Sequence, residues 1–131
     1  MEIEHELKVK SVNDIVEIDV SGEKMGLLIG KRGDTLDAVQ YLTSLYVNKG
    51  ESGYVKINID TENYRQKREE TLIRLAKGLE RRVLTSRKSV TLEPMSPYER
   101  RIIHAALQNS HRIKTYSVGN EPNRKIVVSV K

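Results

Sequence analysis

Two glycines enclose two cations in the segment Gly30-Lys31-Arg32-Gly33. Glycine adopts positive φ readily and carries no Cβ, so a sugar-phosphate chain can come close to the backbone amides of such a loop. Lys31 and Arg32 would supply the positive charge. A Walker A loop is excluded because no Gly-Lys-Ser/Thr follows a longer glycine loop, and the dinucleotide fingerprint lacks its third glycine. The spacing predicts a loop that holds a phosphate backbone, with a plain turn between two helices as the alternative.

A second candidate site lies near the C-terminus, where Arg100 and His104 are four residues apart in a predicted helix. The segment Ser96-Pro97-Tyr98-Glu99 has the form of a capping box with Pro at the first helical position, so we expect the helix to begin there. At about 100° per residue, Arg100, His104 and Gln108 form one ridge on the exposed side. The apolar residues share a buried arc centred opposite Arg101: Ile102, Ile103, Ala106 and Leu107.

The chemistry of this ridge suits a nucleic acid. A guanidinium group binds phosphate bidentately, and an imidazole ring adds a hydrogen bond or stacks on a base. Arg100, Arg101 and His104 are therefore predicted nucleic-acid contacts. An ordinary surface arginine beside an ordinary histidine is the alternative.

The elements that must position the glycine loop follow from periodicity. We expect a hairpin of two strands, residues 3–10 and 15–20, with its turn at Asn13-Asp14. A short helix from about residue 24 should lead into the loop. A helix over 34–47 and a third strand over 54–60 should follow it. The stretch 49–53 breaks the chain before that third strand. In the helix 34–47, residues at helical spacing fall on one side: Thr35, Ala38, Val39, Leu42, Leu45 and Tyr46.

A long basic helix is predicted next, over residues 62–87, with Asp60 or Thr61 as its cap. Its apolar positions recur at steps of three and four: Leu72, Leu75, Ala76, Leu79 and Val83. Gly78 inside it costs up to about 1 kcal/mol relative to Ala, so we expect close packing or a slight bend there. A short strand at 90–94, the helix that begins after Ser96, and strands at 114–118 and 124–130 complete the chain.

Composition and charge limit the function. The 131 residues contain no cysteine, which excludes a disulfide scaffold and cysteine-based metal sites or catalysis. Residues 1–60 hold 7 Lys and Arg against 11 Asp and Glu, whereas residues 61–131 hold 16 against 7. Such asymmetry indicates a positive face with a polyanionic partner, and a solvated basic surface is the alternative. With no apolar run of about 18 residues and no signal peptide, we expect a cytoplasmic protein that does not insert into a membrane.

An enzyme is the least expected class. His5, His104 and His111 show no H-E-x-x-H spacing, and no serine has the context of a nucleophile elbow. We predict no catalytic residue, no metal and no cofactor. The alternative to nucleic-acid binding is a protein–protein adapter or dimerising scaffold with incidental nucleic-acid affinity, because the first half is acidic and aromatic residues are sparse.

Both sites resemble known domains. The Gly-x-x-Gly loop with its apolar flanks resembles a KH domain, and the element order is closer to the type II arrangement. The segment 99–104 is similar to the Arg-x-x-x-His core of the R-three-H domain. A KH module followed through a basic helix by this domain resembles the Jag (SpoIIIJ-associated) family of bacterial RNA-binding proteins over nearly the whole chain. The most specific matching parts are residues 28–42 and 96–104.

This resemblance implies an α+β protein with a type II-like KH domain at 1–86, the long linking helix included, and a small α+β R-three-H domain at 87–131. It implies a non-catalytic single-stranded RNA-binding protein, a bacterial post-transcriptional regulator linked to cell elongation, division or sporulation. The partners implied are single-stranded RNA, with single-stranded DNA as the alternative, and a second small KH protein or a second copy. Longer members carry an N-terminal Jag domain and a linker. A truncated chain and a naturally short member both explain their absence here.

Overall fold

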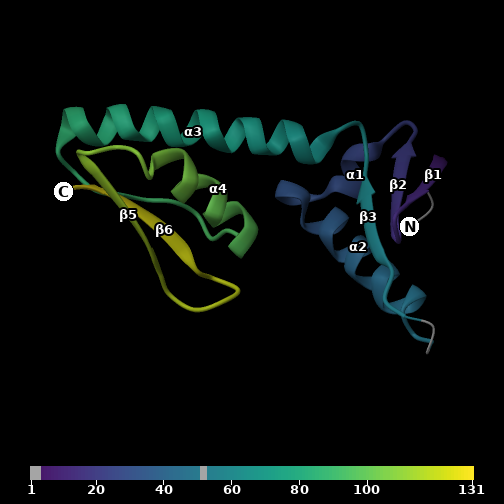
Figure 1. Ribbon diagram of the computed structural model, residues 1–131. Coiled ribbons are helices and arrows are strands. Elements are labelled where there is room, and N and C mark those ends of the chain that lie inside the picture. Colours follow the sequence, from purple (N-terminus) through teal and green to yellow (C-terminus); the bar gives the residue numbers. More distant parts are fainter. Residues whose placement is uncertain (1–3, 51–52) are drawn as a thin grey trace. The chain divides into compact units, whose positions relative to one another are not determined.

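The computed structural model describes residues 4–50 and 53–131 (Figure 1). The predicted strand start at Ile3 and the centre of the predicted break, residues 51–52, lie outside them. The chain divides into two compact units, Met1–Lys67 and Arg68–Lys131. This division differs from the predicted boundary at 86/87, because Leu72, Ala76 and Val83 of the long helix pack into the core of the second unit.

The first unit is a three-stranded sheet with helices on one face (Figure 1). Its elements are β1 (Glu6–Val12), β2 (Ile15–Ser21), α1 (Met25–Ile29), a 3₁₀ turn (Lys31–Gly33), α2 (Asp34–Val47) and β3 (Lys56–Asp60). In the order β1-β2-β3, β1 pairs antiparallel with β2, and β2 pairs parallel with β3. The two helices and the glycine loop form the crossover that parallel strands require. The predicted hairpin turn is confirmed, since Asn13 and Asp14 both have left-handed φ.

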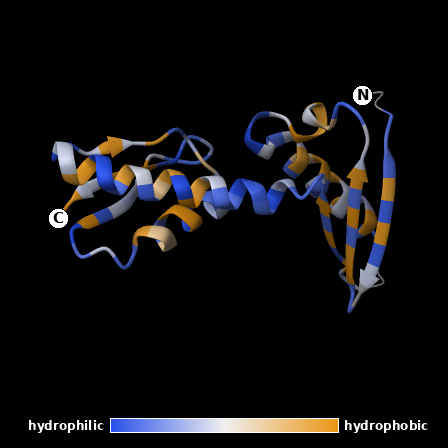
Figure 2. Cartoon of the chain, turned by 90° about the horizontal axis from the view of Figure 1, so that it is seen from above, coloured by the Kyte–Doolittle hydropathy of each residue, from blue (hydrophilic) through white to orange (hydrophobic). Residues whose placement is uncertain are grey.

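The core of the first unit lies between the sheet and the helices. It contains Val20, Met25, Leu28, Leu36, Ile57 and Ile59. Figure 2 shows the apolar and polar alternation along its strands. Side chains of β2 that face the core alternate with the exposed Glu17 and Asp19, as a half-buried strand requires.

The orientation of α2 differs from the expectation. The side chains of Leu42, Leu45 and Tyr46 are 54–77% exposed, and only Leu36 is fully buried. The side turned to the sheet carries Gln40, whose Oε1 accepts a hydrogen bond of 2.7 Å from the Ile59 amide. A polar side chain thus occupies the position beside β3, and the most apolar face of the helix points to solvent.

Helix α3 (Tyr64–Ser86) begins two residues later than predicted. Glu62 and Asn63 have φ of 53° and 56°, which no right-handed helix accepts. The Asp60 carboxylate accepts from the amides of Thr61 (2.8 Å) and Arg65 (3.3 Å), in agreement with its predicted capping role. The close packing expected at Gly78 is not found: a Cβ there would meet nothing within 4 Å.

The second unit packs α3 from Arg68 onward, and a shorter helix, onto an antiparallel sheet. The other elements are β4 (Val90–Thr91), α4 (Pro97–Leu107), β5 (Ile113–Val118) and β6 (Lys125–Val130), in the sheet order β4-β6-β5. Buried core residues are Leu72, Ala76, Val83, Met95, Ile103, Leu107, Ile113, Ile126 and Val128. Leu75, predicted with the apolar stripe, is 41% exposed. The α+β class is confirmed. Within the described ranges no helix is long and apolar enough to cross a bilayer.

Candidate nucleic-acid interface

The Gly30–Gly33 loop joins α1 to α2 through left-handed backbone. Gly30, Arg32 and Gly33 have φ of 69°, 54° and 80°. A Cβ on Gly30 would collide with the Thr35 side chain, and one on Gly33 would lie 2.8 Å from Cε1 of Tyr64. Both glycines are therefore required by the backbone conformation and by packing, and the loop has one well-defined shape.

The cations of this loop differ in exposure. Lys31 is exposed and Arg32 is half-buried. Gly33 is the N-cap of α2 and offers no side chain to the first amides of that helix. Amides at a helix N-terminus carry partial positive charge and suit an anion. Asp34 and Asp37 stand in the same turn and oppose this effect.

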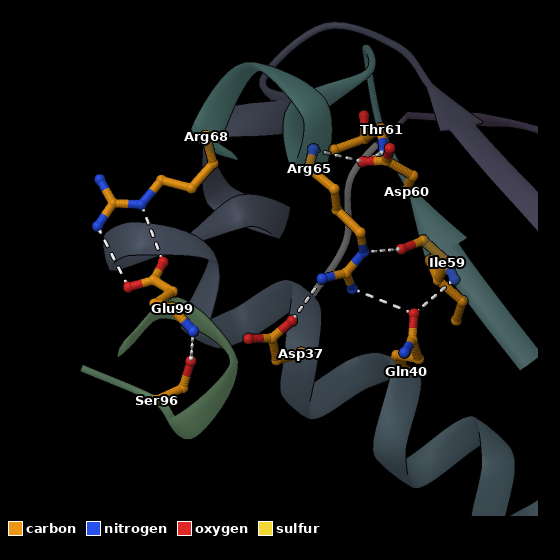
Figure 3. A network of polar contacts seen from close by, with 9 residues as sticks. All are labelled: Asp37, Gln40, Ile59, Asp60, Thr61, Arg65, Arg68, Ser96 and Glu99. Atoms are coloured by element: carbon orange, nitrogen blue, oxygen red, sulfur yellow. Dashed lines mark hydrogen bonds and ion pairs between the residues drawn. The ribbon is translucent and has the colours of Figure 1, made fainter. Parts of the chain in front are cut away.

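Arg65 offsets part of that negative charge (Figure 3). Its guanidinium group forms an ion pair of 2.6 Å with Asp37 and donates to the Ile59 carbonyl (2.9 Å) and to Oε1 of Gln40 (3.1 Å). The start of α3, β3 and the first turns of α2 are thus held together. From the sequence, Arg65 is one of several cations on a basic helix. Its two side-chain partners, Gln40 and Asp37, lie 25 and 28 residues away, too far for local patterns to reveal.

Arg100 does not lie on an exposed ridge, so that expectation is wrong. The residue is only 7% exposed. Its guanidinium group donates to the Met95 carbonyl (2.6 Å) and forms an ion pair with Glu121. These partners belong to the segments just before α4 and between β5 and β6. Arg100 thus holds α4 to the segment that precedes it and to the loop between β5 and β6.

His104 lies half-buried between α4 and β5. Its Nδ1 is 2.6 Å from Oγ1 of Thr115, and its Nε2 is 3.2 Å from Oγ of Ser117. Burial, and then the nearby charge of Arg100, lower the pKa of His104 below its usual value, so the ring is neutral at neutral pH. The alternation of the predicted strand places Thr115 and Ser117 on one face, a signal that could have identified them as its partners.

The start of α4 is anchored to α3. Ser96 Oγ accepts from the Glu99 amide (3.3 Å), which is half of the predicted capping box. The Glu99 carboxylate does not complete it, because it pairs with Arg68 at 2.9 Å instead (Figure 3). Arg101, two residues further along α4, is exposed, as expected.

Charge is divided unevenly between the units. Residues 1–67 contain 9 Lys and Arg against 12 Asp and Glu, a net charge of −3. Residues 68–131 contain 14 against 6, a net charge of +8. The second unit therefore carries the general attraction for a polyanion, while positive charge in the first is local to sites such as the glycine loop.

Comparisons with known proteins also divide the chain into two domains. Residues 1–59 match the KH domain of the KhpA/KhpB type, and residues 70–130 match the R-three-H domain. The chain is similar to the RNA-binding protein KhpB of Clostridium symbiosum, with 54% identity over 116 residues, 88% of this chain and 52% of that protein. The KhpB protein of Bacillus subtilis (strain 168) is 46% identical over 128 residues, 96% of this chain and 62% of the relative.

A third relative is similar at lower identity over most of the chain. The RNA-binding protein KhpB of Streptococcus pneumoniae serotype 2 is 34% identical over 113 residues, 86% of this chain and 34% of that protein. The chain thus spans about half to two thirds of the first two relatives, and a third of this one. The chain belongs to the Jag family, in which a KH domain of the KhpA/KhpB type is followed by an R-three-H domain.

Proposed function

We propose that the chain is a non-catalytic single-stranded RNA-binding protein whose Gly30–Gly33 loop holds the backbone of about four unpaired nucleotides. The observation that carries this proposal is the left-handed loop itself, with Lys31 exposed and with Gly33 as an N-cap that offers no side chain to the first amides of α2. A phosphate contacts amides and ammonium together in such a loop. The name of the KhpB relatives, RNA-binding protein, supports the ligand.

The bases would lie against apolar side chains beside the loop. Leu27 of α1 and Leu42 of α2 are 59% and 63% exposed. Both belong to the helices that flank the loop, and with the adjacent strand they form the groove that we propose for the bases. Unstacked bases bind such a surface, whereas the bases of a duplex are already paired and stacked.

The second unit contributes charge and a second contact. We assign Arg101 as an RNA contact. For His104 a direct contact with RNA remains a prediction, because both of its ring nitrogens already bond Thr115 and Ser117. The burial of Arg100 favours a positioning role, and a direct contact with RNA remains a prediction for this residue. Two weak sites on one chain strengthen each other through effective concentration.

The decisive variant combines Lys31→Asp and Arg32→Asp. Aspartate tolerates the left-handed φ of residue 32 better than most residues, so the loop can keep its shape. We expect affinity for a labelled 12-nucleotide single-stranded RNA to fall about tenfold or more, because phosphate binding depends on these charges. The control carries the same charge change on exposed residues of the same unit, Lys49→Asp with Lys56→Asp, and should change affinity about threefold or less. Equal losses in both variants would reject the loop as the site.

A non-catalytic role has its own test. Labelled RNA incubated with the protein and Mg²⁺ should stay intact. Cleavage that disappears in His104→Ala would instead make the chain a nuclease.

Its cellular role follows from the family resemblance. We place the chain in the cytoplasm of a bacterium, as a post-transcriptional regulator linked to cell elongation, division or sporulation. Crosslinking of bound RNA in cells, followed by sequencing, tests this role. Enrichment of transcripts for these processes is expected, and recovery of ribosomal RNA alone would contradict it.

A second candidate function is a protein adapter, with a second small KH protein or a second copy as the partner. The observation in its favour is the uncovered apolar face of α2, where Tyr41, Leu42, Leu45 and Tyr46 are 54–77% exposed. Exposed apolar patches often mark protein interfaces. Light scattering against concentration, with Leu45→Asp as the variant, separates the two functions: RNA binding that persists at monomer concentrations favours the RNA-binding role.

A further inference from the structure

A groove runs between α3 and α4 within the second unit. Its volume is about 520 Å³, within the range of ligand clefts. From α3 it is lined by Glu69, Ile73 and Lys77, which recur every four residues along one face. From α4 it is lined by Tyr98 and Arg101 together with Ile102, Ala105 and Ala106. His104 lies outside it, bonded to β5.

The groove combines a flat apolar surface with positive charge. Ile73 and Ile102 are half-buried, and the two alanines leave the space open. Tyr98 lines the groove and is 59% exposed, so much of this aromatic side chain is accessible to a ligand. Lys77 and Arg101 are exposed cations against one acid, Glu69, which leaves a net charge of +1 at the groove.

A nucleotide of a single strand has the matching chemistry. Its base is a flat ring that stacks on an aromatic side chain, and its phosphate binds Arg and Lys. The net charge of +8 on this unit favours a polyanion over a neutral or cationic peptide as the ligand. Further exposed cations on α3, Arg74, Arg81 and Arg82, extend the positive surface along the helix.

We propose that the α3–α4 groove is a nucleotide-binding site, which takes a base against Tyr98, Ile73 and Ile102 and the adjoining phosphate on Arg101 and Lys77. The proposal rests on the single-stranded RNA binding proposed above and adds a site on the side of α4 away from His104. It gives the second unit a base contact as well as a charge contact.

The test measures binding of the full chain to a labelled 12-nucleotide single-stranded RNA of mixed sequence by fluorescence anisotropy. Tyr98→Ala should weaken binding about tenfold, the order expected for one lost stacked base, and Tyr98→Phe should bind like the parent chain. Ala105→Trp fills the groove without removing a charge and should weaken binding to a similar degree. Arg101→Gln should weaken binding and lower the slope of log Kd against log salt by about 0.7. The matched variant Arg74→Gln removes the same charge outside the groove and should weaken binding less than Arg101→Gln does.

The outcomes separate this proposal from the function on which it rests. Circular dichroism first establishes that each variant is folded. RNA carrying 5-iodouridine should crosslink to Tyr98 in the parent chain. If the parent chain binds RNA while Tyr98→Ala and Ala105→Trp both bind equally well, the groove is not a nucleotide site and a protein segment becomes its better occupant. If the parent chain does not bind RNA at all, the proposed function itself fails.

Discussion

Replacing Arg100 by Met should destabilise the second unit by about 1.5–4 kcal/mol, the sum of two lost interactions. Methionine keeps most of the aliphatic stem but removes the two guanidinium N–H groups that donate to Met95 and Glu121. The hydrogen bond to the Met95 carbonyl is buried and charge-assisted, and its loss costs about 1.5–3 kcal/mol. The ion pair with Glu121 adds only about 0–1 kcal/mol, because that carboxylate is 49% exposed.

Hydrogen exchange read by mass spectrometry is the appropriate assay, since it assigns a loss of stability to one unit of the chain. Amides of β6 and α4 should lose about 1.5–4 kcal/mol of protection, while those of β2 keep theirs. Arg101→Met is the matched control: the neighbouring arginine is exposed, and its loss should change stability by about 0.5 kcal/mol or less. A loss below about 0.5 kcal/mol in Arg100→Met, together with weakened RNA binding, would refute the positioning role.

Three further perturbations test other parts of the structure. Gly33→Ala should destabilise the first unit by about 1–3 kcal/mol, because alanine opposes the positive φ and its Cβ would press on Tyr64; unchanged protection in β3 would contradict this. Gly78→Ala should raise the thermal midpoint by adding about 0.5–1 kcal/mol, since the new methyl group meets nothing within 4 Å; a lower midpoint would mean that the helix needs glycine there. His104 has a lowered pKa when folded, so stability of the second unit should be full above the unfolded pKa of about 6.5 and fall as pH drops below it; His104→Gln should flatten this dependence in urea titrations across pH 5–8.

Local patterns were sufficient for most of the fold. The hairpin turn at Asn13-Asp14 and the Ser96 cap depend on residues that are neighbours in sequence, and both are confirmed. The predicted start of α3 was wrong by two residues, because Glu62 and Asn63 have left-handed φ and the helix begins only after them. Nothing in the propensity of these two residues requires that conformation.

Side-chain partners were the part that local patterns missed. The spacing of Arg100 and His104 correctly made them near neighbours on α4, but their partners arrive from β5 and from the loop before β6. Gln40 likewise meets the Ile59 amide 19 residues away, while Leu42, Leu45 and Tyr46 of the same helix are exposed. Such contacts depend on tertiary packing, whereas helical periodicity reports only which residues share a face.

The salt dependence of RNA binding tests the central claim most directly, because it counts the phosphates that the loop holds. Affinity for the 12-nucleotide RNA should be measured over a range of salt concentrations for the parent chain, the Lys31→Asp, Arg32→Asp variant and the Lys49→Asp, Lys56→Asp control. If Lys31 and Arg32 each neutralise one phosphate, the slope of log affinity against log salt should be smaller by about 1.4 in the loop variant alone. The same slope in all three chains would contradict the assignment of the Gly30–Gly33 loop as the RNA-binding site.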